Sequence, residues 1–311
     1  MAFCLVAHAD SRRNKTNDMK GKYLSPKADL TFKLVFGEHK DLVMSLLNAL
    51  LPLPEDAPIT AVEYDTPEMA PEYSGKKNSV VDVRCTDARD RHFLVEMQMN
   101  WSEEFKKRVI MNASKAVMKQ VGTGEMFARI APVFSLNLLN DEGFERDSDE
   151  FYHDYAILNV AHPERSIDYL RFVFVELPKF KPRNVMEKKM AVLWLRFLTE
   201  INEDTAEVPA ELMENPEISK ALAIVEKSAM TEEQLYAYER FWDALNREDV
   251  LMRDKYNQGH EAGRAEGEAK GRAEGEVKGR TEVAKKMKDS GMAAEMIAGF
   301  TGLSLDEINR L

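Results

Sequence analysis

The sequence predicts an α/β fold in which a mixed sheet is flanked by helices and followed by a helical C-terminal extension. Between residues 58 and 178, β-branched and aromatic runs recur between polar turns, as is typical of strands. From Val185 to about Asn257 the apolar spacing is helical instead. The 311 residues, 44% of them hydrophobic, suffice for one sizeable core or two small ones.

Composition excludes several classes of protein. No apolar stretch approaches the roughly 20 residues that a helix needs to span a bilayer, so we expect no membrane contact. Two cysteines, Cys4 and Cys85, provide neither a disulfide framework nor a cysteine-rich zinc site, which fits a reducing cytoplasm. The net charge of −11 argues against a general nucleic-acid coat protein, so any DNA contact requires a local basic patch.

The first expected elements are a tail, two short helices and a strand. Residues 1–22 are expected to form an N-terminal tail without fixed structure. Apolar residues near helical spacing in 29–51 predict two helices separated at Gly37, with Asp29 able to cap the first. Residues 58–66 then have a strand pattern and precede a proline-rich loop.

A longer helix and three further strands complete the predicted core, residues 23–184. The helix has Ser102 as its N-cap, Glu103 and Glu104 in its first turn, and an expected end at Gly122. The strands occupy 132–139, 151–159 and 169–178. Together these elements predict a sheet with helices beside it.

The rest of the chain is expected to divide into a helical cap at 185–258, a glycine-repeat segment at 259–282 and a small helical pair at 283–311. Each glycine of the four-residue repeat costs about 1 kcal/mol in a helix interior. The segment is therefore either a loosely helical or disordered tether, or a helix whose glycines let a second copy approach and form a homo-oligomer. The final pair, with Ser304 as a candidate N-cap, also leaves a helix-turn-helix open, although it lacks strong basic residues.

The stretch at 80–99 predicts a hairpin that carries the chemistry. If it turns at its Asp-Ala-Arg-Asp segment, Asp82 faces Glu96 across the two strands. Val80 then faces Gln98, and strand alternation puts the polar side chains on one face and the apolar ones toward the core. Two opposed carboxylates repel each other unless a cation lies between them. Mg²⁺, which takes oxygen ligands from one or two carboxylates plus water and a substrate phosphate, meets this need.

A plainer alternative applies to each candidate. Asp82 and Glu96 could also be solvent-facing residues of an exposed sheet face. Their spacing alone does not decide between this interpretation and a metal site.

Basic residues near the hairpin have the same ambiguity. Arg108, Lys115 and Lys119, spaced by seven and four, form a stripe that suits DNA phosphates or a solvated helix face. Lys77, in the loop before the hairpin, is a further candidate for DNA contact.

Taken in order, these stretches resemble the transposase-like branch of the PD-(D/E)XK nuclease superfamily, the recombination-promoting nuclease (Rpn) family. The resemblance runs through LSPKADLTFKLVFG, KNSVVDVRCTDARDRHFLVEMQM, GEMFARIAPVFSLNLL and LRFVFVELPKF to the glycine repeats and the closing TGLSLDEINRL. It covers most of the chain and implies a restriction-endonuclease-like α/β core.

The resemblance implies a Mg²⁺-dependent DNA endonuclease, linked to recombination, mobile elements or defence, with Asp82 and Glu96 as metal ligands. Gln98 falls on the third catalytic position, which is usually lysine in the superfamily and commonly glutamine in this branch. Because glutamine is a neutral donor, the missing positive charge is expected from the following helix, where Arg108 is the first candidate.

One departure from the family pattern bears on activity. The helix after the site typically has tyrosines following its arginine, and here VIMNASKAVM contains none. The alternative function is therefore a catalytically weak or inactive nuclease-fold protein that binds DNA or acts as an oligomeric scaffold.

Overall fold

The computed structural model describes residues 21–65, 68–69, 79–80, 82–122, 127–182 and 189–311. Apart from residues 21 and 22, the expected N-terminal tail lies outside the described residues, as does Lys77. The chain divides into two compact units, of which the first ends at Trp242 and the second comprises Asp243–Leu311. The boundaries expected at 184, 258 and 282 stay predictions.

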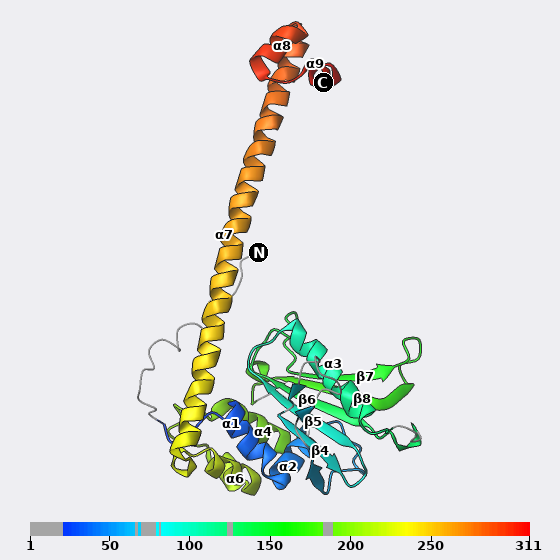
Figure 1. Cartoon of the computed structure of the whole chain (residues 1–311), viewed down its shortest axis with the longest axis vertical. Helices are drawn as coiled ribbons and strands as arrows, with labels where there is room; N and C mark the ends of the chain where they lie inside the picture. The colour runs from blue at the N-terminus through cyan, green and yellow to red at the C-terminus, as the bar shows by residue number, and fades with distance from the viewer. Residues whose placement is uncertain (1–20, 66–67, 70–78, 81, 123–126, 183–188) are drawn as a thin grey trace. The chain divides into compact units, whose positions relative to one another are not determined.

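A six-stranded mixed sheet forms the centre of the first unit and confirms the predicted fold class (Figure 1). The strands of this sheet are β1 (Val62–Tyr64), β4 (Val83–Asp87), β5 (His92–Gln98), β6 (Val133–Leu139), β7 (Tyr152–Leu158) and β8 (Ser166–Glu176), and a separate small sheet contains β2 (Glu68–Met69) and β3 (Ser79–Val80). The six lie in the order β1-β4-β5-β6-β8-β7. Strands β5, β6 and β8 are parallel neighbours, and the outer pairings are antiparallel.

Helices cover both faces of this sheet (Figure 1). Helices α2 (Lys40–Leu50) and α4 (Lys189–Glu200) lie on one face and α3 (Glu103–Met118) on the other. The other helices of the described residues are α1 (Asp29–Phe32), α5 (Ala210–Glu214), α6 (Pro216–Ile224), α7 (Glu232–Asp289), α8 (Ala294–Thr301) and α9 (Leu305–Arg310), together with a π-helix, η1 (Lys33–Gly37), and the 3₁₀ turns η2 (Phe127–Arg129), η3 (Leu177–Lys179) and η4 (Lys227–Ala229). None of the helices in the described ranges is both long and apolar enough to cross a membrane.

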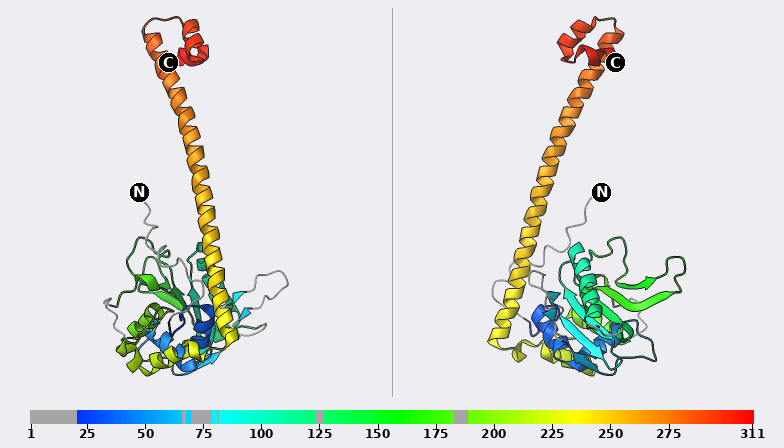
Figure 2. Two further views of the ribbon diagram at one scale, coloured as in Figure 1. Left: turned by 90° about the vertical axis from the view of Figure 1, so that its left-hand side faces the viewer. Right: turned by 45° about the vertical axis from the view of Figure 1, so that its right-hand side comes forward.

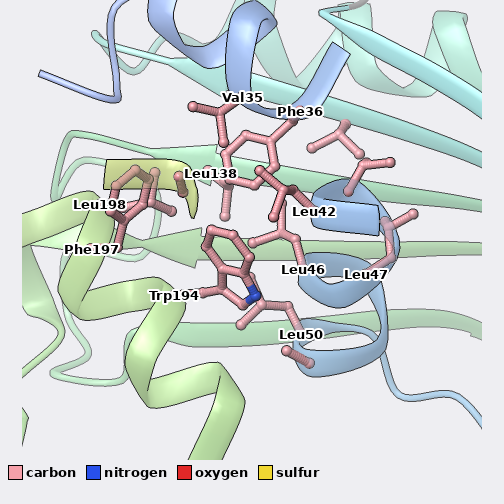
Figure 3. Packing of buried hydrophobic residues seen from close by; sticks show 14 of the residues in the cluster. Val35, Phe36, Leu42, Leu46, Leu47, Leu50, Leu138, Trp194, Phe197 and Leu198 are labelled. Atoms are coloured by element: carbon pink, nitrogen blue, oxygen red, sulfur yellow. The ribbon is translucent and has the colours of Figure 1, made fainter. Parts of the chain in front are cut away.

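The larger core lies between one face of the sheet and helices α2 and α4 (Figure 3). Trp194 of α4 is fully buried there, its ring meets Phe36 edge to face at 5.2 Å, and its Nε1–H donates to Ser45 Oγ at 3.1 Å. Leu138 of β6 contributes to the same cluster from the sheet. Full burial of one such apolar side chain stabilises the fold by roughly 1.5 to 3 kcal/mol, so this layer holds the strands in place.

Helix α3 covers the opposite face. Its small residues Ala113 and Ala116 pack on Leu94 and Val133, and this small-on-large contact brings the helix close to β5 and β6. Ser102 caps the helix as predicted, because its Oγ accepts the Phe105 N–H at 3.1 Å. The helix ends at Met118, four residues before the predicted stop at Gly122.

The predicted hairpin register is confirmed between β4 and β5. Val83 pairs with Val95 and Thr86 with His92, the alignment expected from a turn at Asp-Ala-Arg-Asp. The predicted pairing of Val80 with Gln98 is wrong, because β4 begins only at Val83 and Val80 pairs instead with Glu68 in the small sheet.

The N-terminal helices differ from expectation at their first residue. Ala28, not Asp29, occupies the N-cap position, and Asp29 is the first helical residue. The Asp29 carboxylate instead forms an ion pair with Lys33 at 2.7 Å, the i,i+4 geometry that a helix favours. As predicted, the helical segment breaks at Gly37, where the π-helix ends.

Helix α7 begins against the N-terminal segment. Tyr238 is buried beside Leu24, accepts the Ser25 N–H at 2.8 Å on its hydroxyl and donates that hydroxyl to Glu203. Leu235, Phe241 and Trp242 pack in the same cluster, so the helical apolar spacing predicted for this segment is confirmed at the first turns of α7.

The remainder of α7 continues as one helix through the glycine repeat, as Figure 2 shows from two further sides. Among the described residues, a Cβ added at any of the six repeat glycines would meet nothing within 4 Å. The predicted helical pair follows, with a left-handed Gly302 between α8 and α9 and a complete capping box between Ser304 and Glu307.

Candidate active site

Two carboxylates meet where β4 begins and β5 ends. Asp82 directly precedes β4, one step beyond the pair of Val83 with Val95, so it lies at the level of Glu96. The backbone N–H of Met97 donates to Asp82 Oδ2 at 2.7 Å and fixes the direction of this side chain. Glu96 is only 4% exposed. The hairpin therefore places two carboxylates side by side at a largely desolvated position.

The electrostatics of this pair are unfavourable without a cation. Burial raises the pKa of Asp82 to about 6, and the negative charge of Glu96 raises it as well. Burial also raises the pKa of Glu96, although hydrogen bonds from Asn112 and Arg108 oppose that shift. A buried acid with a raised pKa costs free energy when it is ionised, so both groups favour a neighbouring positive charge.

Arg108 supplies positive charge next to Gln98. Its Nη2 donates to Gln98 Oε1 at 2.8 Å and lies 3.6 Å from Glu96 Oε2. The guanidinium also lies over the Phe105 ring at 4.9 Å, and the other end of the Gln98 amide donates to the Asn100 carbonyl at 2.7 Å. Gln98 is thus held in one orientation, with a cation beside it.

Asn112 is a site residue that sequence reasoning missed in this role. It is fully buried one turn after Arg108, and its Nδ2 donates to Glu96 Oε1 at 2.8 Å. The i,i+4 spacing of Arg108 and Asn112 is the available signal, because it directs both toward the same strand.

Asp29 and Lys33 also act on the site. Beyond the effect of burial, the charge of Asp29 raises the pKa of Asp82 and the charge of Lys33 lowers it. The Asp29–Lys33 ion pair therefore lies within electrostatic range of the carboxylates. The sequence explained Asp29 by capping alone and gave Lys33 no role.

A comparison with known protein families gives a match over most of the chain. Residues 26–250 match the family described as PD-(D/E)XK nuclease family transposase, which is more than half of the chain. The chain belongs to this family. No curated protein and no solved structure matched. The resemblance inferred from the sequence is confirmed, and membership supports a nuclease-like, transposase-related function with DNA as the suggested substrate.

PD-(D/E)XK nucleases generally use divalent metals, and the donors at this site suit one. Within the described ranges, no group of three or more His, Cys, Asp or Glu side chains could hold a metal ion. Mg²⁺ does not need three, because it commonly binds one or two carboxylates together with water and a substrate phosphate. Asp82 and Glu96 are hard oxygen donors whose mutual repulsion a divalent cation would relieve, so this pair fits Mg²⁺.

The other basic residues predicted for DNA contact do not all join this PD-(D/E)XK site. Lys115 lies half-buried in α3, two turns beyond Arg108. Lys119 is exposed just past the end of α3 and lines a pocket near the start of β5. The structure therefore gathers Asp82, Glu96, Gln98 and Arg108 and leaves Lys119 at the far end of the helix.

Proposed function

We propose that this protein is a Mg²⁺-dependent DNA endonuclease that hydrolyses phosphodiester bonds. The observation that carries the proposal is the contact of one guanidinium, that of Arg108, with both Gln98 and Glu96. This contact provides the positive charge that glutamine lacks and that lysine carries elsewhere in the superfamily. Family membership supports the same reaction class.

Each residue has a separate role in the proposed mechanism. Asp82 and Glu96 would hold Mg²⁺, which when bound lowers the pKa of a water and stabilises the developing charge of the phosphate. Asn112 keeps the Glu96 carboxylate in its orientation. Gln98 orients the attacking water or a nonbridging phosphate oxygen through its amide.

Arg108 is assigned to charge stabilisation. The attack of water on a phosphodiester builds negative charge on the phosphate oxygens, and a fixed guanidinium next to the site stabilises that charge more than it stabilises the substrate. Removal of one such donor typically costs about 3 to 4 kcal/mol. Lys115 and Lys119, further along α3, are proposed to contact the DNA backbone outside the reacting phosphate.

The biological setting is proposed from the family description. A nuclease within a transposase family fits a role in recombination, mobile-element activity or defence against foreign DNA. The competing function is a binding or scaffold protein of the same fold that does not cleave. It is favoured by the absence of the family's tyrosines after Arg108.

Nicking of supercoiled plasmid with and without Mg²⁺ tests the proposal. Wild type should nick in Mg²⁺ and not in a chelator, and Glu96→Ala should abolish nicking. Glu104→Ala, which removes an exposed carboxylate at the start of α3, is the matched control and should retain activity. Equal activity of wild type and Glu96→Ala would refute the assigned site, and inactivity of every variant would favour the scaffold.

A further inference from the structure

A second polar pocket lies at the opposite end of α3 from the carboxylates. It has a volume of about 660 Å³ and is lined by side chains of β4, the β4–β5 turn, the start of β5 and the segment that follows α3. The lining includes Arg84, Arg89, His92, Lys119 and Arg129. We refer to it as the α3-end pocket.

The walls of the α3-end pocket are fixed by hydrogen bonds. The Gln120 amide accepts the Ala131 N–H at 2.6 Å and donates to the Ala131 carbonyl at 3.1 Å, which closes one side. On the other side, Asp87 Oδ1 accepts the N–H groups of Arg89 and Arg91 at 3.0 and 2.9 Å and so fixes the β4–β5 turn. The backbone of Arg89 is thereby fixed, which reduces the entropy lost on binding. Its Nη2 donates to the Asp56 carbonyl at 3.2 Å.

Charge in the α3-end pocket favours an anion. Among the described residues, four basic side chains line it, and Asp90 is the one carboxylate. Arg84 is paired with Asp65 at 3.2 Å, so we count the net excess from Arg89 and Lys119 against Asp90. The C-terminal end of α3 adds roughly half a negative charge, which this excess outweighs. Such a concentration of positive charge stands out in a chain whose net charge is −11.

The position of the pocket relative to the carboxylates follows from the sheet register and from α3. Arg84 and Asp82 are two residues apart and therefore point to the same face of the sheet. Along α3, Lys119 lies eleven residues after Arg108, which corresponds to roughly 16 Å at 1.5 Å per residue. In duplex DNA this length spans about five base pairs.

We propose that the α3-end pocket binds a backbone phosphate of the DNA substrate, about five base pairs from the phosphate held at Asp82 and Glu96. Arg89, Lys119 and Arg129 are the residues that contact it. The assignment rests on the proposed nuclease function for the identity of the DNA. It fixes the register of the duplex along α3, because the two ends of this helix then hold two separate phosphates.

Binding of a fluorescent duplex of about 20 base pairs, measured by anisotropy in EDTA over a range of salt concentrations, tests the proposal without any cleavage. The test variant combines Arg89→Ala with Lys119→Ala, both at exposed positions where the fold is not at risk. Arg165→Ala, at the exposed tip between β7 and β8, removes a cation elsewhere and is the control. Thermal melts of wild type and of both variants establish that they are folded.

The double variant should bind DNA about ten-fold more weakly, and the slope of log K against log salt should fall in magnitude by about 0.9, since the pocket is proposed to neutralise one phosphate. An affinity and slope equal to those of Arg165→Ala would overturn the proposal. Titration with inorganic phosphate is a second arm. If the double variant loses phosphate binding but keeps its DNA affinity, the pocket takes a free phosphate and the DNA assignment is wrong. Because cleavage is not measured here, failure of plasmid nicking and failure of the α3-end pocket are separate results.

Discussion

Moving the positive charge from Arg108 to the position of Gln98 provides the sharpest test of how this site works. If Arg108 supplies the charge that lysine supplies in related nucleases, then the position of the charge can be moved back to the strand. Arg108→Ala should slow cleavage, and adding Gln98→Lys to that variant should restore much of it. Gln98→Lys alone should be harmful.

The magnitudes follow from the geometry. Arg108 is 44% exposed, so its charged hydrogen bond is screened by solvent, and we take the lower range of about 1.5 to 3 kcal/mol for its loss. This corresponds to a fall in rate of roughly ten- to a hundred-fold. In Gln98→Lys alone, an ammonium would lie beside the guanidinium that now contacts Gln98 at 2.8 Å. Two such cations about 4 Å apart repel by roughly 1 to 4 kcal/mol, depending on solvent screening.

The assay is single-turnover nicking of supercoiled plasmid at saturating Mg²⁺ and enzyme, so that the measured rate reports chemistry. The double variant should cleave at least about ten-fold faster than Arg108→Ala and approach wild type. If the two substitutions are instead additive, so that the double variant is slower than either single variant, Arg108 does not replace the lysine and this reasoning fails.

Three further predictions concern stability, assembly and reactivity. Glu96→Gln should raise the free energy of unfolding in EDTA by roughly 1 kcal/mol, because it removes a buried charge beside Asp82, and Mg²⁺ should stabilise wild type but not this variant in urea melts. Unchanged stability in EDTA together with equal Mg²⁺ stabilisation would contradict the metal assignment. Deletion of 259–282 should lower the mass measured by light scattering if the glycine helix joins copies of the chain, whereas an unchanged mass would leave it as a tether. Burial raises the pKa of the Cys85 thiol to about 12. In a Cys4→Ser protein, a thiol reagent at pH 8 should therefore label Cys85 only after unfolding. Rapid labelling of the folded protein would show that the thiol is accessible.

Local patterns with a single dominant cause could be predicted from the sequence. The β4–β5 register followed from the turn and from strand alternation, because a slip of one residue would have put Val83 and Val95 on the polar face. Ser102 and Ser304 were recognisable as caps because serine is a preferred N-cap residue. In the structure, each hydroxyl accepts the backbone N–H three residues later. These features depend on neighbours close in the chain.

Features that depend on competing partners were not predictable. Asp29 has the chemistry of an N-cap, but a nearby Lys33 offers an ion pair, and the helix starts one residue earlier. Val80 continues the alternating pattern, yet Glu68 from a distant segment takes its pairing. In both cases the sequence shows which interactions a residue is able to make, but not which partner the fold brings to it.

The candidate site likewise contains residues that the sequence could indicate and one that it could not. The sequence and the family resemblance indicated Asp82, Glu96 and Gln98, because these lie in one short stretch. The contact of Asn112 with Glu96 requires the packing of α3 on β5, which local spacing does not determine. The roles assigned to these residues stay predictions until the variants are measured.

The glycine repeat inside α7 also has a consequence for the order in which parts of the chain unfold. Each glycine costs about 1 kcal/mol relative to alanine, and within the part of the chain that the structure describes, nothing lies within 4 Å of a Cβ built at these positions to offset that cost. Backbone hydrogen bonds should therefore break there long before the core unfolds, so amide protons of this segment should exchange with solvent early. Limited proteolysis would accordingly cut first within 259–279 and separate the end of the chain that carries α8 and α9 from the sheet-containing unit, while the latter is still folded.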